Sequence, residues 1–225
     1  MRGDKYGSFD ELRRAEREGV DFRIRVMRRE ASVAIIAPHG GKIEPGTSEL
    51  AEAIAGNDYS LYCFEGLQKR PHRDLHITSA NFREPRCEEL VVACDRVVAV
   101  HGRGVKERQS VEVGGLDTDL RDAICRSLQD AGFSAEVVTS GGLAALSPAN
   151  ICNRGARRAR RAARGHAGSA RAAAYATAGP SRLCAGRAAS DHLGDPGAPL
   201  LRRFAAAATA VDQSASPVPA PVPAR

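Results

Sequence analysis

The hydrophobic pattern of residues 1–155 changes between two periods, and it predicts strands and helices in alternation. Residues 22–26 alternate apolar and basic side chains, which is typical of a half-buried strand. Continuous apolar runs at 32–37 and 96–100 indicate strands that are covered on both faces. Further strands are expected at residues 59–64, 75–78 and 135–138.

Helices are predicted between these strands. Ser8 and Glu11 have the spacing of a capping box, and Thr47 is expected to cap a second helix that ends at Gly56. Two more helices follow from apolar positions on one helical face: Cys87, Leu90, Val91 and Cys94, and then Leu120, Ile124 and Leu128. Strands separated by helices predict an α/β fold in which helices cover both faces of a mixed, mainly parallel sheet, a three-layer α/β/α arrangement.

The segment 156–225 differs in composition from the rest of the chain. It contains 23 Ala among 70 residues and no Ile, which leaves few large side chains to offset the entropy of ordering. We therefore place a boundary near Gly155, between a folded domain at 1–155, which we expect to be incomplete and to lack its terminal strand, and an Ala/Arg/Pro-rich, low-complexity, disordered or poorly folded tail at 156–225.

The net charge of +6 belongs to the tail alone. Residues 156–225 hold 11 Arg and 3 Asp and carry +8, whereas residues 1–155 hold 22 basic and 24 acidic residues and carry −2. The positive charge thus predicts nucleic-acid binding only through the tail, as a basic arm whose affinity would fall with salt. No apolar run reaches the roughly 20 residues of a membrane span, so no membrane partner is expected. The polar N-terminus does not resemble a signal peptide, which makes the cytoplasm the default expectation.

Candidate chemistry lies where two predicted strands end. The run at 32–37 leads into His39 and the run at 96–100 leads into His101, and in open α/β sheets active groups gather beyond the carboxyl ends of strands. Glu44 follows His39 by five residues, and Gly40 and Gly41 give the intervening loop freedom to turn so that both side chains face one point. Two imidazoles and one carboxylate form a common catalytic zinc set, although a turn with hydrogen-bonded histidines fits the spacing equally well.

Five ordered motifs make the chain similar to a known family. APHGGKIEPGTSELA, LHITSANFREP, VVAVHGR, VGGLD and NICNRG together resemble the phage-type poly-γ-glutamate hydrolases, over roughly residues 5 to 155. The resemblance implies a zinc carboxypeptidase-like fold, Zn²⁺ on His39, Glu44 and His101, and hydrolysis of an anionic γ-glutamyl polymer or peptide. Zinc would polarise the amide carbonyl and activate water as the nucleophile.

Four further residues are candidates for substrate binding. Asn153 and Arg154 resemble the Asn-Arg pair that holds a substrate carboxylate in carboxypeptidases, and an arginine fork suits that task. The alternative is an exposed loop arginine. Arg103 is a weaker candidate of the same kind, and His76 is expected to line the site or to be a hydrogen-bonded structural residue.

The general base that the resemblance implies is missing. The family pattern places this carboxylate beyond NICNRG, on a segment reading approximately GVQLE, but residues 156–225 contain no Glu. A frameshift is one explanation, because codons for residues 161–165 permit Val-Gln-Leu-Glu when they are read one base later. We therefore expect a zinc-dependent γ-glutamyl hydrolase with weak or no turnover, or alternatively a catalytically inactive metal-binding or polyanion-binding protein with a basic tail.

Overall fold

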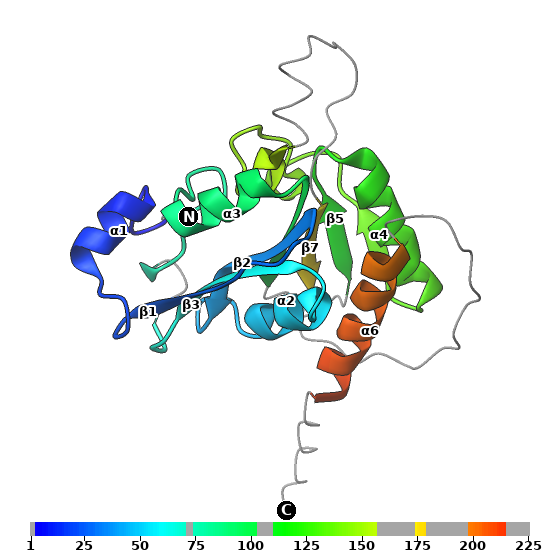
Figure 1. Cartoon of the computed structure of the whole chain (residues 1–225), viewed down its shortest axis with the longest axis horizontal. Coiled ribbons are helices and arrows are strands. Elements are labelled where there is room, and N and C mark those ends of the chain that lie inside the picture. Colours follow the sequence, from blue (N-terminus) through cyan, green and yellow to red (C-terminus); the bar gives the residue numbers. More distant parts are fainter. Residues whose placement is uncertain (1–2, 71–73, 103–109, 157–173, 179–197, 215–225) are drawn as a thin grey trace, which may run out of the picture.

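The computed structural model describes residues 3–70, 74–102, 110–156, 174–178 and 198–214 (Figure 1). Seven strands of these residues form one sheet: β1 (Phe22–Met27), β2 (Val33–Gly41), β3 (Ser60–Gly66), β4 (Arg96–Gly102), β5 (Val111–Gly114), β6 (Ala135–Val137) and β7 (Ala174–Ala178). The strand order is β1-β3-β2-β4-β7-β5-β6. Only the β1–β3 and β5–β7 pairs are antiparallel, so the predicted mixed, mainly parallel sheet is confirmed.

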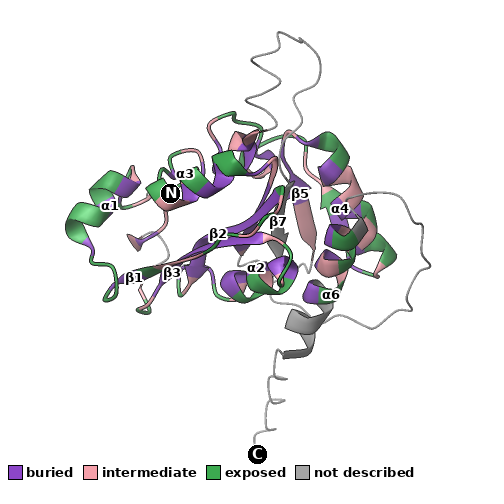
Figure 2. Cartoon of the chain, viewed as in Figure 1, coloured by how far each residue is buried: buried purple, intermediate pink, exposed green. Residues whose placement is uncertain are grey.

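Helices cover both faces of this sheet, as predicted (Figure 1). Ala34 and Ile36 of β2 pack into one core with buried residues of α1 (Phe9–Ala15) and α3 (Pro85–Ala93). Ile35 of β2 points to the opposite core, which contains buried residues of α2 (Thr47–Ala55), α4 (Thr118–Asp130) and α6 (Ala198–Ser214). The continuous apolar run of β2 is therefore buried on both faces, as Figure 2 shows, because successive side chains of a strand point to opposite sides.

The N-cap residue predicted from the sequence is correct for α1 and wrong for α2. The Ser8 hydroxyl accepts a hydrogen bond from the Glu11 amide at 3.2 Å and begins α1, as the capping box predicts. The prediction that Thr47 caps α2 is wrong, because the cap is Gly46 in a left-handed conformation with φ of 93°. The Thr47 hydroxyl donates instead to the Glu44 carbonyl at 2.7 Å, inside the preceding turn.

The strand predicted at residues 75–78 is absent from the structure. Residues 76–78 have no regular secondary structure, and the amide of Thr78 donates to the carboxylate of Asp4 rather than to a neighbouring strand. The apolar alternation of Leu75 and Ile77 is real, since both are buried, but it belongs to a loop that crosses the edge of the sheet. Periodicity alone does not distinguish such a loop from a short strand.

Two elements of the segment 156–225 join the fold, and the hydrophobic pattern predicted neither. β7 lies between β4 and β5 in the sheet, and α6 packs against α2 and α4. Leu200 and Phe204 of α6 are buried in the second core. The boundary near Gly155 stays a prediction, and residues 157–173 of the proposed basic arm lie outside the described residues.

Three cysteines on or next to helices α3 and α4 are buried free thiols. Cys87, Cys94 and Cys125 are all buried and unpaired. Burial raises the pKa of each of these thiols. Among the described helices, none combines the length and the apolar character needed to cross a membrane.

Candidate metal centre

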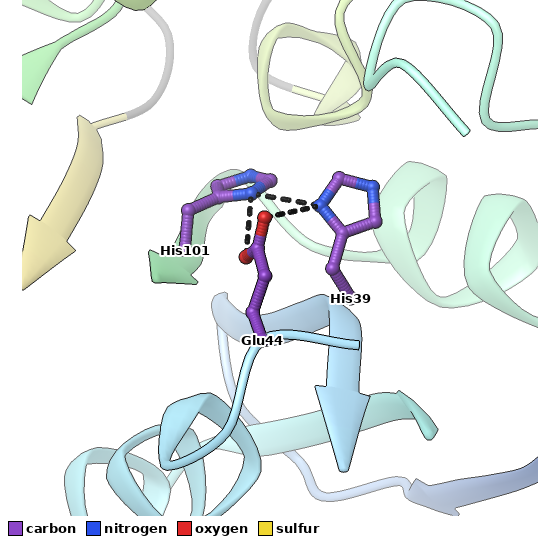
Figure 3. A group of neighbouring side chains, drawn as sticks. All are labelled: His39, Glu44 and His101. Atoms are coloured by element: carbon purple, nitrogen blue, oxygen red, sulfur yellow. Dashed lines mark hydrogen bonds and ion pairs between the residues drawn. The ribbon is translucent and has the colours of Figure 1, made fainter. Parts of the chain in front are cut away.

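The ends of β2 and β4 bring two histidines together. The strands are parallel neighbours, with Ile36 opposite Ala99, so their carboxyl ends lie at the same edge of the sheet. His39 and His101 point toward each other from these ends, and their Nδ1 atoms are 3.0 Å apart (Figure 3). Both side chains are almost completely buried, with 1% and 2% of their surface exposed.

A tight turn after β2 adds Glu44 to the pair. The Glu44 amide donates to the His39 carbonyl at 2.9 Å, which folds the chain back on itself. Gly41 has φ of 62°, and a Cβ there would lie 2.6 Å from the Gly66 carbonyl, so both the conformation and the space require glycine. The two Glu44 carboxylate oxygens lie 3.4 Å from His39 Nδ1 and 3.5 Å from His101 Nδ1.

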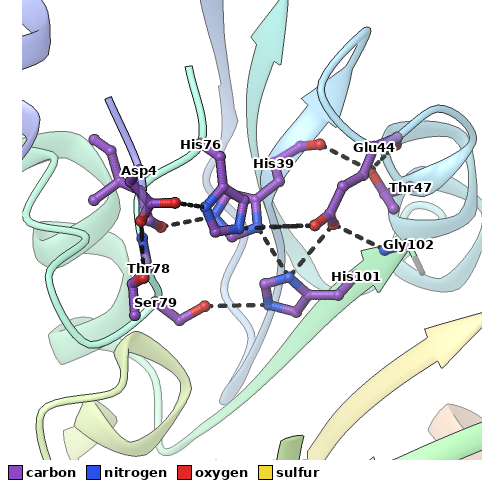
Figure 4. Close-up of polar contacts among 10 residues, drawn as sticks. Asp4, His39, Glu44, Thr47, His76, Thr78, Ser79, His101 and Gly102 are labelled. Atoms are coloured by element: carbon purple, nitrogen blue, oxygen red, sulfur yellow. Dashed lines mark hydrogen bonds and ion pairs between the residues drawn. The ribbon is translucent and has the colours of Figure 1, made fainter. Parts of the chain in front are cut away.

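Surrounding groups orient each of the three side chains. His39 Nε2 lies 2.8 Å from the carbonyl of Ile77, which can only accept, so Nε2 carries the proton and Nδ1 presents its lone pair. His101 Nε2 makes a longer contact of 3.4 Å with the Ser79 hydroxyl (Figure 4). The Gly102 amide donates to Glu44 Oε2 at 2.8 Å. Metal-binding histidines commonly have such a partner on the ring nitrogen that faces away from the metal.

The protonation states also suit metal binding. Burial lowers the pKa of His39, although the nearby Glu44 carboxylate opposes this effect. Burial alone would raise the pKa of Glu44, but the close contacts of its carboxylate with the rings of His101 and His39 outweigh it and hold that pKa well below its usual range. A neutral imidazole and an ionised carboxylate are the forms in which these side chains bind metals.

The donor set fits a divalent metal of zinc type. One ligand atom from each of His39, Glu44 and His101 lies within 4.8 Å of the others, and in the part of the chain that the structure describes no other such group occurs. Two nitrogens bound to one tetrahedral zinc at about 2.0–2.1 Å lie roughly 3.3 Å apart, close to the observed 3.0 Å. Two imidazoles and a carboxylate leave a fourth coordination position for substrate or water.

His76 lies beside this group. Its ring stacks on that of His39 with centroids 4.0 Å apart, and its Nε2 is 4.0 Å from Glu44 Oε1. Its Nδ1 donates to Asp4 at 2.7 Å (Figure 4). Sequence reasoning missed Asp4 because it is 72 residues away and belongs to no motif near the histidines. Whether His76 binds substrate stays a prediction.

The other predicted substrate-binding residues have different surroundings. Asn153 is completely buried, and its side-chain amide donates to the carbonyls of Ala145 at 2.6 Å and Ser147 at 2.8 Å. These contacts hold the chain that leads into the 3-10 helix Ile151–Arg154. The Arg154 guanidinium donates to the carboxylate of Glu88 on α3 and, at 3.4 Å, to the carbonyl of Phe82. The ring of Phe82 in turn packs edge-on against that of His39.

Arg103, the last of these candidates, lies outside the described residues. The substrate-binding roles of Asn153, Arg154 and Arg103 therefore remain predictions.

Comparison with known proteins identifies the family. The family model described as poly-gamma-glutamate hydrolase matches residues 6–160. The chain belongs to the poly-gamma-glutamate hydrolase family. YmaC of Bacillus subtilis (strain 168) is 43% identical over 156 residues, which cover 68% of this chain and 64% of YmaC. The SPbeta prophage-derived protein YoqZ of the same strain is 39% identical over 155 residues, which cover 68% of this chain and 56% of YoqZ.

Solved structures of the poly-gamma-glutamate hydrolase family share the fold. A bacteriophage poly-gamma-glutamate hydrolase superimposes with a TM-score of 0.71 at 26% identity, covering 92% of this chain and 97% of the phage enzyme. A zinc-free form of YndL superimposes with a TM-score of 0.70 at 27% identity, covering 94% and 98%. In sequence, the matched region spans about three fifths of the length of the curated Bacillus relatives.

Proposed function

We propose that the chain binds one zinc ion on His39, Glu44 and His101 and hydrolyses γ-glutamyl amide bonds of poly-γ-glutamate. The observation that carries the proposal is the approach of the two Nδ1 atoms and the Glu44 carboxylate in a chain of this family. The choice of zinc is supported by YndL, whose solved structure is an apo, zinc-free form. The choice of substrate is supported by the phage member of the family.

The residues of the chain have separate tasks in this proposal. His39 and His101 offer ring nitrogens, and Glu44 supplies the negative charge that partly balances a divalent cation. A bound zinc ion would supply Lewis acidity toward the amide carbonyl and activate water for attack. Arg154, together with Arg103, would bind carboxylates of the polymer, since a guanidinium can donate two parallel hydrogen bonds to a carboxylate.

Slow turnover is part of the proposal. Proton transfer by a positioned side chain contributes a factor of about 10² to 10⁴ to the rate. The family pattern expects a carboxylate after residue 155, and the sequence of 156–225 has no Glu. We therefore expect hydrolysis that is slower by about that factor than in relatives with the carboxylate.

The missing carboxylate also favours a second candidate, a metal-binding protein that retains the polymer without cleaving it. The basic segment 156–225, with 11 Arg against 3 Asp, would add affinity for a polyanion. In this case, binding of poly-γ-glutamate would weaken steeply as the salt concentration rises.

One sample of the purified 225-residue chain distinguishes the two candidates. Zinc content is measured by mass spectrometry of the metal, and hydrolysis is followed as the loss of polymer length for poly-γ-glutamate and, in parallel, for α-linked polyglutamate. Zinc together with cleavage of the γ-linked polymer supports the enzyme, and zinc without cleavage supports the binder. A chain that takes up no zinc when zinc is supplied would contradict both.

A further inference from the structure

Residues 76–79 form a loop that passes beside His39 and His101, and this loop contacts every residue of the candidate metal centre. The Ile77 carbonyl accepts from His39 Nε2 at 2.8 Å, and the Ser79 hydroxyl lies 3.4 Å from His101 Nε2. The His76 ring stacks on His39 and faces Glu44. The segment 76–79 thus supplies the outer partners on the sides of both imidazoles that face away from their paired Nδ1 atoms (Figure 4).

No strand or helix holds residues 76–78 in place. Ile77 is buried in the core, and a carboxylate from the N-terminal segment accepts hydrogen bonds from the residues on either side of it. Asp4 Oδ2 accepts from the Thr78 amide at 2.7 Å and from the Thr78 hydroxyl at 2.8 Å, while Asp4 Oδ1 accepts from His76 Nδ1 at 2.7 Å. Both carboxylate oxygens of Asp4 therefore accept hydrogen bonds from His76 and Thr78, the residues on either side of Ile77.

Asp4 is itself anchored to the core. Tyr6, two residues further along, is buried with Phe9 of α1 in the core that also contains Ile77. The Tyr6 hydroxyl donates to Glu16 at 2.7 Å, which ties the N-terminal segment to the end of α1. Because the segment that carries Asp4 is anchored to the core, the Asp4 carboxylate can hold residues 76–78 at a fixed position relative to the core.

We propose that Asp4 is a positioning residue of the metal centre, which holds residues 76–78 so that the outer partners of His39 and His101 keep both rings aimed at one ion. This inference rests on the proposed zinc binding. Asp4 touches none of the three ligands in the described contacts, and it acts through His76 and Thr78. Losing an outer partner of a metal-binding histidine typically weakens metal affinity by about 10- to 100-fold.

The test compares Asp4→Ala with Glu16→Gln in the full-length chain. Glu16→Gln is the matched control, because Glu16 holds the same N-terminal segment through Lys5 and Tyr6 but has no described contact with residues 76–79. Zinc affinity is measured by competition with a chromogenic chelator, and the absorption spectrum of the cobalt-substituted protein reports ligand geometry. Hydrogen exchange of the metal-free protein reports the protection of residues 75–79.

We expect Asp4→Ala to bind zinc about 10- to 100-fold more weakly, to alter the cobalt spectrum and to exchange faster at 75–79. Glu16→Gln should change only the unfolding temperature. Asp4→Asn keeps one carbonyl oxygen and should lie between the wild type and Asp4→Ala, so it serves as the test if Asp4→Ala does not fold. Folded Asp4 variants with wild-type zinc affinity and cobalt spectrum would overturn the positioning role while leaving the metal centre intact. Failure of the unsubstituted chain to bind zinc would overturn the metal centre and this inference together.

Discussion

The Nδ1 atoms of His39 and His101 lie 3.0 Å apart although the two residues are separated by 62 positions in the chain. Parallel pairing of β2 with β4 creates this approach, and the turn that follows β2 places the Glu44 carboxylate against both rings. In the proposed centre, the three side chains bind one ion together, so removing any one of them should weaken zinc binding.

His39→Ala and His101→Ala should each lower zinc affinity by more than about 100-fold, because loss of an outer partner alone already costs 10- to 100-fold. The double variant should bind zinc only slightly more weakly than either single variant, since removing one histidine already leaves an incomplete ligand set. Chelator competition measures the affinities, and Cys125→Ala, a buried thiol on α4, controls for adventitious binding to cysteine. Unchanged zinc content in His101→Ala would contradict the proposed ligand set.

Arg154→Ala should weaken binding of poly-γ-glutamate to the zinc-loaded chain by roughly 10- to 100-fold, the range expected from losing a hydrogen bond between charged groups. The control is Glu88→Gln, which removes the carboxylate that Arg154 contacts but leaves the guanidinium in place. Glu88→Gln should bind the polymer at least as well as the wild type. Equal polymer affinity in Arg154→Ala and the wild type, measured by fluorescence anisotropy at fixed salt, would exclude a role for Arg154 in binding.

Gly41→Ala should destabilise the fold and disturb the turn to Glu44. Its φ of 62° costs a non-glycine residue about 1–3 kcal/mol, and the new Cβ would also lie 2.6 Å from the Gly66 carbonyl. Urea denaturation measures the loss in free energy of unfolding. Gly142→Ala is the control, because a Cβ at Gly142 meets no atom within 4 Å. A Gly41→Ala variant as stable as Gly142→Ala would contradict the structure of the turn.

Phe204→Ala should lower the free energy of unfolding by about 3–5 kcal/mol, the usual cost of removing a buried aromatic ring. Phe204 is 3% exposed and packs α6 into the core shared with α2 and α4. Ala206→Ser, at an exposed position of the same helix, should change stability little. A loss below about 1 kcal/mol for Phe204→Ala would show that α6 does not dock as described, since single buried deletions rarely cost so little.

Protonation of Glu16 should lower the stability of the chain in acid. Burial alone would raise its pKa, but hydrogen bonds from Tyr6, Arg70 and Lys5 lower the pKa of Glu16 to about 2. Because the unfolded state takes up the proton first, at a pKa of about 4.3, stability present above that pH is lost as the pH falls toward 2. We expect this loss to be about 1–2 kcal/mol, since Lys5 is partly exposed to solvent and screened.

Urea denaturation at several pH values between 5 and 2 measures this effect. The Glu16→Gln variant should show a shallower pH dependence than the wild type over that interval. Glu11→Gln, which removes an exposed carboxylate bonded to the Gly7 amide, should keep the wild-type slope. Parallel curves for the wild type and Glu16→Gln would show that Glu16 does not carry this stability.

Local periodicity accounts for the elements that were predicted correctly. The apolar runs of β2 and β4 and the helical stripe of α4 are read from neighbouring residues, because burial on two faces or on one stripe leaves a repeating signal. The same signals place His39 and His101 at the ends of two strands. The proposed ligand set therefore follows from the sequence together with the family resemblance.

The sequence by itself determined the four helices and five of the six strands described in residues 1–155, the mixed α/β class and the three candidate ligands, but it missed β5 and placed a strand at 75–78 that is absent. Only the tertiary structure revealed that β7 and α6 join the fold, that residues 76–78 form a loop, and that Asp4 holds this loop. It also showed that Asn153 is fully buried and bonded to main-chain carbonyls. These features depend on pairing between distant segments, and contacts such as that of Asp4 with His76 leave no period in the chain for a pattern to detect.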